Sequence, residues 1–281
     1  MEENIENFSI GYLIKILLNN LTRILALGLI FASIFFGLSF FFEKKYLSEA
    51  TIIEVVDSSS SLSASSLFGI DLGRSNNSAK AIAVMQSRDF IYYFLTKYNL
   101  LSLIEKNEDI DISNINENKK EIVFSPELKV LSKIPGIVGK FNKEILTIDQ
   151  ADVDGIIILS ISTKKPEYSQ KILDLFIKEI DKIMKLDFIS QTKANINALK
   201  NLTTEVKDPL SLNIISELHN EEQKNLIKAE TSEFFSFKLL DSPYLPINHY
   251  FPNRLLFIIF GFILGIIIGY LYFFRKKIAF N

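Results

Sequence analysis

A long uncharged stretch near the C-terminus constrains this chain more than any other feature. Leu255–Phe274 is a run of about twenty residues without a charged side chain, which is the length that an α-helix needs to cross a bilayer. Arg275, Lys276 and Lys277 follow it directly. We therefore predict a transmembrane helix at 255–274 and a short tail at 275–281.

Glycine recurs at every fourth residue inside this predicted helix. Gly261, Gly265 and Gly269 therefore share one helix face, where the missing side chains let another helix approach closely. The alternative is that glycine is simply common in membrane helices. We interpret the spacing as a packing face, and we expect a Gly265→Leu variant to impair function while its folding stays largely intact. Pro243, Pro246 and Pro252 stiffen the chain just before the helix.

A second uncharged stretch lies near the N-terminus. Ile24–Phe42 is about nineteen residues long, enough to span a bilayer. A cleaved signal peptide is the alternative, because Ser48-Glu49-Ala50 loosely resembles a small-x-small cleavage site. The apolar core is longer than that of a signal peptide, however, and the chain starts with acidic residues. We predict a transmembrane helix at 24–42 after an amphipathic lead at 1–23.

The orientation follows from the cations that flank the two predicted spans. Lys15 and Arg23 precede the first span, and Arg275, Lys276 and Lys277 follow the second. Positively charged flanks stay on the cytoplasmic side. Lys44 and Lys45 oppose this bias at the first span, so the tail decides the orientation. We expect both termini in the cytoplasm and residues 43–254 outside, in a periplasm or an equivalent space.

The composition excludes several classes of protein. The 281 residues are 48% hydrophobic, and the mean hydropathy of +0.22 is high for a soluble protein. Two membrane spans account for that excess. The formal net charge of −2 does not indicate nucleic-acid binding. Cysteine is absent, which excludes disulfides, thiolate nucleophiles and cysteine-ligated metals.

The central segment mixes strand and helix patterns. Runs rich in Ile, Val, Thr and Phe predict strands at 46–56, 156–161 and 234–240. Apolar residues at helical spacing predict a helix at 79–98. The polar stretch 58–78 is predicted as a loop. Residues 101–150 have the least clear pattern. We predict a turn at Pro135-Gly136 and short strands or helix ends at 122–124 and 144–148 there.

A helical arm is the longest element predicted in this segment. Pro166 suits the first turn of a helix, and apolar residues continue at helical spacing to about Val206. Lys207-Asp208-Pro209 ends this helix, and a second, polar helix follows to Thr231. The predicted fold class is α+β: two transmembrane helices flank a periplasmic α/β base domain that carries a long projecting helical hairpin at 166–231.

Catalytic motifs are absent from the sequence. It contains no GxxxxGKS/T, GxGxxG, GxSxG or HExxH pattern. Of the two histidines, His219 lies on a polar helix face and His249 lies between prolines at the predicted membrane boundary. Asp152 and Asp154 are better explained by a turn before a strand than by an acid–base pair. We expect no catalytic residue, metal or cofactor.

Several of these pieces resemble the Wzz-type chain-length determinants, a family of polysaccharide co-polymerases. The first span followed by Tyr46–Val56 looks like the start of their domain, and Ser87-Arg88-Asp89-Phe90 is similar to their first outer helix. Ile157–Ser162 followed by Lys165-Pro166 resembles their strand and proline helix start. The most specific match is the motif of Pro243, Pro246 and Pro252 with Gly261, Gly265 and Gly269, which overlaps the second span.

The resemblance implies a non-enzymatic protein of the bacterial inner membrane. Family members form homo-oligomeric rings and set the modal length of a lipid-linked polysaccharide made by a Wzy-type polymerase. The six proline and glycine positions would then contact another protomer or the polymerase. This chain is short for the family. It also lacks the tyrosine-kinase features of capsule members, and this second difference favours the lipopolysaccharide O-antigen branch.

Three other functions are considered. An inner-membrane adaptor of capsule or exopolysaccharide export shares two spans and a helical outer arm. A two-span sensor would need a cytoplasmic output domain, and the predicted tail at 275–281 is too short for one. An enzyme acting outside the membrane would need a clustered acid–base pair, for which the sequence gives no sign.

Overall fold

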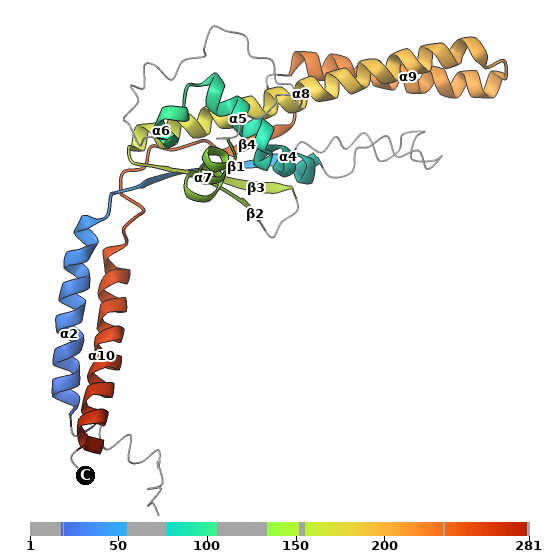
Figure 1. Cartoon of the computed structure of the whole chain (residues 1–281). Coiled ribbons are helices and arrows are strands. Elements are labelled where there is room, and N and C mark those ends of the chain that lie inside the picture. The colour runs from blue at the N-terminus through green and yellow to red at the C-terminus, as the bar shows by residue number, and fades with distance from the viewer. Residues whose placement is uncertain are drawn as a thin grey trace, which may run out of the picture. The chain divides into compact units, whose positions relative to one another are not determined.

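The computed structural model describes residues 18, 20–54, 77–105, 134–151, 155–232 and 234–279. The chain divides into two compact units. The membrane unit contains Met1–Lys45 and Asn248–Asn281, and the outer unit contains Tyr46–Ile247. Both units are drawn in Figure 1.

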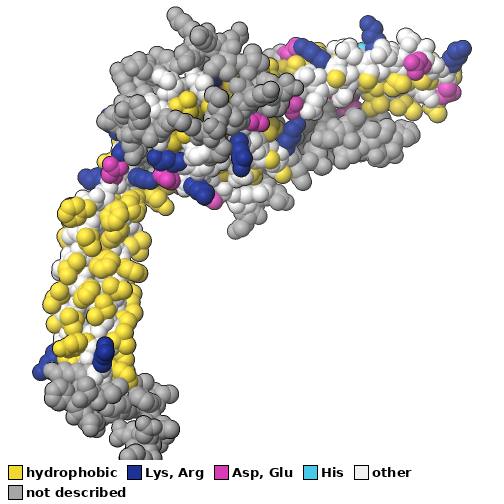
Figure 2. Space-filling model, in the orientation of Figure 1, with side chains coloured by type: hydrophobic (Ala, Val, Ile, Leu, Met, Phe, Trp, Pro, Cys, Tyr) yellow, Lys and Arg dark blue, Asp and Glu magenta, His cyan; other side chains and the backbone are white. Residues whose placement is uncertain are grey.

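The membrane unit is a pair of apolar helices. Helix α2 (Leu21–Leu38) continues into a short 3₁₀ turn, η1 (Ser39–Phe41), and helix α10 covers Arg254–Ala279. Both are long and apolar enough to cross a membrane, with mean hydropathies of 2.4 and 2.6 over their spanning stretches. Hydrophobic side chains cover most of the visible surface of the pair (Figure 2). These helices fit a two-pass membrane protein.

The two helices run antiparallel. Gly261 of α10 lies against Phe35 of α2, whereas Gly269 lies against Ile24, so the residue numbers run in opposite directions along the contact. Arg23 and Arg275 consequently lie at one end of the pair. Arg254 and the end of η1 lie at the other end.

The outer unit is built on a four-stranded antiparallel sheet. Its strands are β1 (Tyr46–Glu54), β2 (Leu146–Gln150), β3 (Ile156–Thr163) and β4 (Phe237–Asp241), in the order β2-β3-β1-β4. Strand β1 pairs with β3 along its length and with β4 across a bulge at Thr51 and Ile52. The sheet therefore joins the segment that follows the first span to the segment that precedes the second.

Helices α5 (Arg88–Lys97) and α8 (Pro166–Glu205) supply most of the core against this sheet (Figure 1). One face of β1 and β3 is fully buried, with Ile52, Ile157 and Leu159 among its apolar side chains. Four phenylalanine rings fill the centre of the core, with centroids 5.2 to 6.3 Å apart, and they belong to Phe90, Phe94, Phe141 and Phe176.

The predicted arm is confirmed. Helix α8 has 40 residues, begins with Pro166 in its first turn and ends just before Val206. Helix α9 (Pro209–Thr231) returns beside it. At 1.5 Å per residue, α8 is about 60 Å long, and its outer half pairs with α9 beyond the sheet (Figure 1).

The predicted α+β fold class is likewise confirmed, but three local predictions are wrong. The helix predicted at 79–98 is split into α4 (Asn77–Gln86) and α5. Its break is at Ser87, whose hydroxyl accepts the Phe90 amide and caps the second helix. Pro135 and Gly136 lie in the first turn of helix α7 (Ile134–Lys140), not in a turn between elements. Strand β4 starts at Phe237, three residues after the predicted start at 234, because the preceding amides are held by a side chain of α8.

Other predictions are partly met or lie outside the described residues. Helix α6 covers Leu101–Glu105, and Glu144 and Ile145 end a π-helical turn, η4 (Phe141–Ile145), from which β2 continues. The lead at 1–17, the loop at 58–76, the segment at 122–124 and the aspartates at 152 and 154 are outside the described part of the chain.

Candidate functional site

The glycine face of α10 lies against α2 of the same chain. A Cβ atom added at Gly265 would lie 2.8 Å from the Gly28 Cα atom and 2.9 Å from the Leu27 carbonyl oxygen. One added at Gly261 would lie 2.7 Å from the Phe35 Cβ atom. All three distances are too short for real contacts, so these two glycines are required for the close approach of the helices.

Gly269 is less constrained, because an added Cβ would be 3.3 Å from a flexible Leu27 methyl group. The face predicted to contact another protomer or a polymerase is thus covered, in this structure, by the first span. That contact with a second protein stays a prediction. The expectation that Gly265→Leu leaves folding largely intact does not agree with this packing, because the larger side chain has no room.

The prolyl segment, Ser242–Ile247, is fixed to the outer unit through its backbone. Gln170 on α8 donates a hydrogen bond from Nε2 to the Pro243 carbonyl at 3.1 Å, and the Ser48 hydroxyl on β1 donates to the Tyr244 carbonyl at 2.7 Å. The Pro246 ring is buried. Side-chain donors from two different elements therefore hold this extended strand of backbone in one place.

Three large apolar side chains of the prolyl segment are exposed, unlike the buried Pro246 ring. Tyr244 and Leu245 are each 48% exposed and Ile247 is 92% exposed. Burial and the nearby Glu49 carboxylate, 3.4 Å from the Tyr244 hydroxyl, raise the pKa of that phenol. An anchored backbone that presents large apolar side chains is typical of a protein–protein or membrane contact.

Pro252 belongs to the membrane unit, unlike Pro243 and Pro246. It lies just before α10, after a cis Phe251–Pro252 peptide bond. The Lys45 amide donates to the Phe251 carbonyl at 2.9 Å, and the Tyr250 amide donates to the Lys45 carbonyl at 2.8 Å. Asn253 caps α10 by accepting the Leu255 and Leu256 amides. The six predicted site residues are therefore divided between the units, with Pro252 and the glycines in the membrane unit.

Sequence reasoning missed a buried ionic cluster that joins α5 to α8. The Glu179 carboxylate accepts hydrogen bonds from the Tyr93 hydroxyl at 2.7 Å, the Lys97 ammonium at 2.7 Å and the Tyr98 hydroxyl at 2.8 Å. Burial raises the pKa of Glu179, but the hydrogen bonds from these three donors and the charge of Lys97 outweigh it, so the pKa lies below its ordinary value. The sequence does contain a signal for a buried charge, because Glu179 falls on the apolar helix face of Ile172, Phe176 and Ile183.

A second buried carboxylate positions β4. Asp181 on α8 accepts the backbone amides of Phe235, Ser236 and Phe237, at distances between 2.7 and 3.3 Å. These bonds tie α8 to the chain that enters β4, and β4 leads into the prolyl segment. Both buried carboxylates are thus used to hold the outer unit together.

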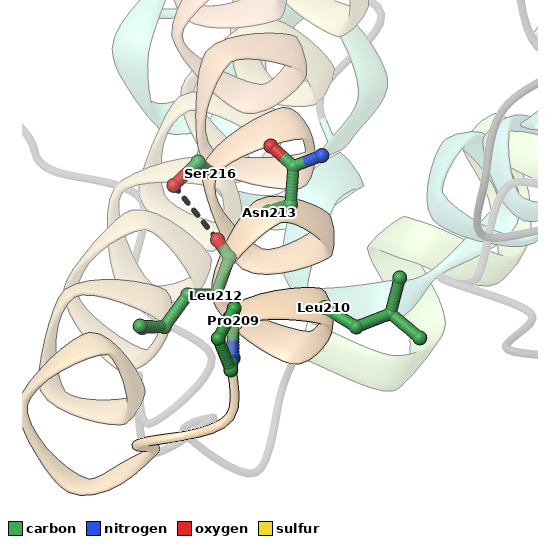
Figure 3. Close-up of a pocket in the computed structure, with 5 residues that line it drawn as sticks. All are labelled: Pro209, Leu210, Leu212, Asn213 and Ser216. Atoms are coloured by element: carbon green, nitrogen blue, oxygen red, sulfur yellow. Dashed lines mark hydrogen bonds between the residues drawn. The ribbon is translucent and has the colours of Figure 1, made fainter.

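The tip of the arm carries a shallow hollow of about 660 Å³ at the start of α9 (Figure 3). It is lined by Pro209, Leu210, Leu212, Asn213 and Ser216, and none of these side chains is charged. Ser216 donates its hydroxyl proton to the Leu212 carbonyl. Asp208 caps α9, and the hydrogen bonds from the Ser211 amide and hydroxyl lower the pKa of this aspartate.

A smaller hollow of about 300 Å³ lies beside the prolyl segment. Its polar groups are already paired in part, since Gln170 binds Pro243 and Asp174 forms an ion pair with Lys178 at 2.8 Å. Within the described residues, no three His, Asp or Glu side chains gather as a metal ion would require.

No family model matches the sequence, and no curated protein matches it. Solved structures do resemble this chain. A full-length bacterial polysaccharide co-polymerase is 13% identical, with 95% of this chain and 97% of that chain covered and a TM-score of 0.40. A fragment of WzzB, a polysaccharide co-polymerase from Salmonella Typhimurium, is 16% identical, with 74% and 100% covered and a TM-score of 0.35.

A variant of the lipopolysaccharide O-antigen chain-length regulator WzzBSF from Shigella flexneri is 11% identical, with 73% and 100% covered and a TM-score of 0.27. All three are co-polymerases or chain-length regulators by name.

Proposed function

We propose that this chain is a non-enzymatic regulator of polysaccharide chain length in a bacterial inner membrane. The observation that carries the proposal is the proline and glycine motif in its structural setting. The prolyl segment is anchored with its apolar side chains exposed, and the glycines pack α10 tightly on α2. A fixed backbone with exposed apolar side chains is suited to contact with another protein.

In the proposed mechanism, the protein acts by binding and positioning its partners and not by catalysing a reaction. Protomers associate into a homo-oligomeric ring, and the membrane-proximal motif contacts a Wzy-type polymerase that extends a lipid-linked polysaccharide. The buried acids Glu179 and Asp181 serve packing, which supports a role without chemistry in the outer unit. Arg23 and Arg275 lie at one end of the helix pair, which supports cytoplasmic termini and a periplasmic outer unit.

A gel of lipopolysaccharide from cells with and without the gene tests the proposal. We expect deletion to convert a clustered ladder of long chains into a short, randomly distributed ladder, and the gene on a plasmid to restore the cluster. An unchanged ladder contradicts O-antigen length control. If another surface glycan is then lost or retained inside the cell, the chain is an inner-membrane adaptor of capsule or exopolysaccharide export instead.

A further inference from the structure

The end of the membrane unit that carries Arg254 has the features of a bilayer boundary. Large aromatic side chains are exposed there, with Phe40 56%, Phe41 87% and Tyr250 63% accessible. Tyrosine and tryptophan at the ends of spanning helices are enriched at the level of the lipid head groups, and Tyr250 is such a residue. Side chains at this end therefore lie at the depth of the lipid phosphates.

Three cations gather at this end beside a single acidic residue. Residues 39–45 and 248–257 contain Lys44, Lys45 and Arg254, and Glu43 is the one carboxylate among them. The backbone bridge between Lys45 and Phe251 holds the two stretches side by side. The Phe42 ring adds to this by packing on Phe251 and Phe257, with centroids 5.8 and 5.3 Å away.

Arg254 is positioned but lacks an anionic partner. Its guanidinium carbon lies 4.3 Å above the centre of the Phe40 ring, which fixes the plane of the group. Within the described residues it forms no ion pair, and its buried Nε has no hydrogen-bond acceptor. A buried donor left unpaired is costly, so the site favours a ligand that accepts hydrogen bonds.

We propose that the Arg254 end binds the phosphate of an anionic membrane lipid. A planar guanidinium presents two parallel N–H groups that match phosphate oxygens, and the lysines add point charges. The aromatic side chains hold this site at the membrane surface, so the phosphate belongs to a lipid rather than to a free ion. Arg23 and Arg275 lie at the opposite end of the helix pair. Both are exposed to solvent, unlike Arg254 with its buried Nε.

The test uses the full-length protein in nanodiscs that contain equal parts phosphatidylglycerol and phosphatidylcholine. Native mass spectrometry then counts the lipids of each kind that stay bound. We expect the protein to retain phosphatidylglycerol in preference to phosphatidylcholine, whose choline masks the phosphate. Arg254→Gln should lower the affinity for phosphatidylglycerol about tenfold, because a charge-assisted hydrogen bond is lost.

The matched control is Arg275→Gln, which removes the same charge at the other end and should change nothing. An equal loss in both variants overturns the proposal, as does the absence of any lipid preference in the wild-type protein. Inorganic phosphate should not displace the lipid, and displacement would make this a free-phosphate site. If Arg254→Gln fails to fold, Lys45→Gln tests the same site.

Discussion

Glu179 is a charged side chain inside the core, and its partners come from a helix more than 80 residues earlier in the chain. An ionised group in this position is tolerated because each hydrogen bond is made and the charge of Lys97 lies 2.7 Å away. Such a cluster adds little net stability compared with an apolar core, but it is costly to break. It therefore specifies how α5 docks on α8.

We expect Glu179→Gln to lower the free energy of unfolding by about 3–5 kcal/mol, because Lys97 stays buried without its counter-ion. Since the folded pKa of Glu179 is lowered, its contribution is fully present above the pKa of an unfolded glutamate and is lost as the pH falls through the folded value. Chemical denaturation of the wild-type protein in detergent at several pH values should show that loss, and the variant should lack it.

The exposed ion pair between Asp174 and Lys178 is the control for this experiment. Asp174→Asn should change the free energy of unfolding by less than about 1 kcal/mol, because solvent screens a surface pair. Equal effects of the two substitutions would contradict a special role for the buried cluster.

At the level of the elements, the contact between α2 and α10 depends on small residues from both helices. Gly28 of α2 faces Gly265 of α10, so neither helix presents a side chain at the closest point. In lipid, this packing must supply the association that burial of apolar surface supplies in water. The arm differs, because α8 and α9 pack through larger side chains, and Ile215 and Ala229 of α9 are buried.

We expect Gly265→Leu to separate α2 from α10 and to destabilise the pair by about 1–3 kcal/mol or more, as overpacking does. Because the chain has no native cysteine, spin labels at Leu29→Cys and Ile267→Cys report the spacing between the helices. Gly37→Leu is the control, because no atom lies within 4 Å of an added Cβ at that position. An unchanged label distance in Gly265→Leu would show that the helices do not pack as described.

For the chain as a whole, the proline and glycine motif belongs to both compact units. Pro243 and Pro246 are held by the outer unit, whereas Pro252 and the glycines belong to the helix pair. The chain passes from one unit to the other after Ile247, the most exposed large apolar residue described.

Under the proposed function, Ile247→Asp should abolish the clustered ladder of long glycan chains without lowering the amount of protein in the membrane. The charged side chain prevents an apolar contact with a partner. The stability of the fold should not change, because the residue is exposed. Leu240→Asp on β4 is the control, since Leu240 is 48% exposed in the same unit. Loss of length control in both variants, or in neither, would argue against a partner at the prolyl segment.

Features that depend on consecutive residues follow from the sequence by itself. Uncharged length predicts both apolar helices, and Pro166 and Pro209 mark the start of each arm helix. The strands β1 and β3 follow from their β-branched runs. The helix break at Ser87 was not predicted, although a serine three residues before Phe90 is itself a capping signal.

Features that depend on distant residues were decided only by the tertiary structure. The strand order, the covering of the glycine face by α2 and the cluster around Glu179 all join residues that lie far apart in the sequence, up to 196 positions in the bond from Ser48 to Tyr244. Periodicity and hydropathy predict an apolar face or the start of a helix, because residues close together in the sequence determine each of these properties. Which surface covers that face depends on packing between segments, and this arises only when the whole chain has folded.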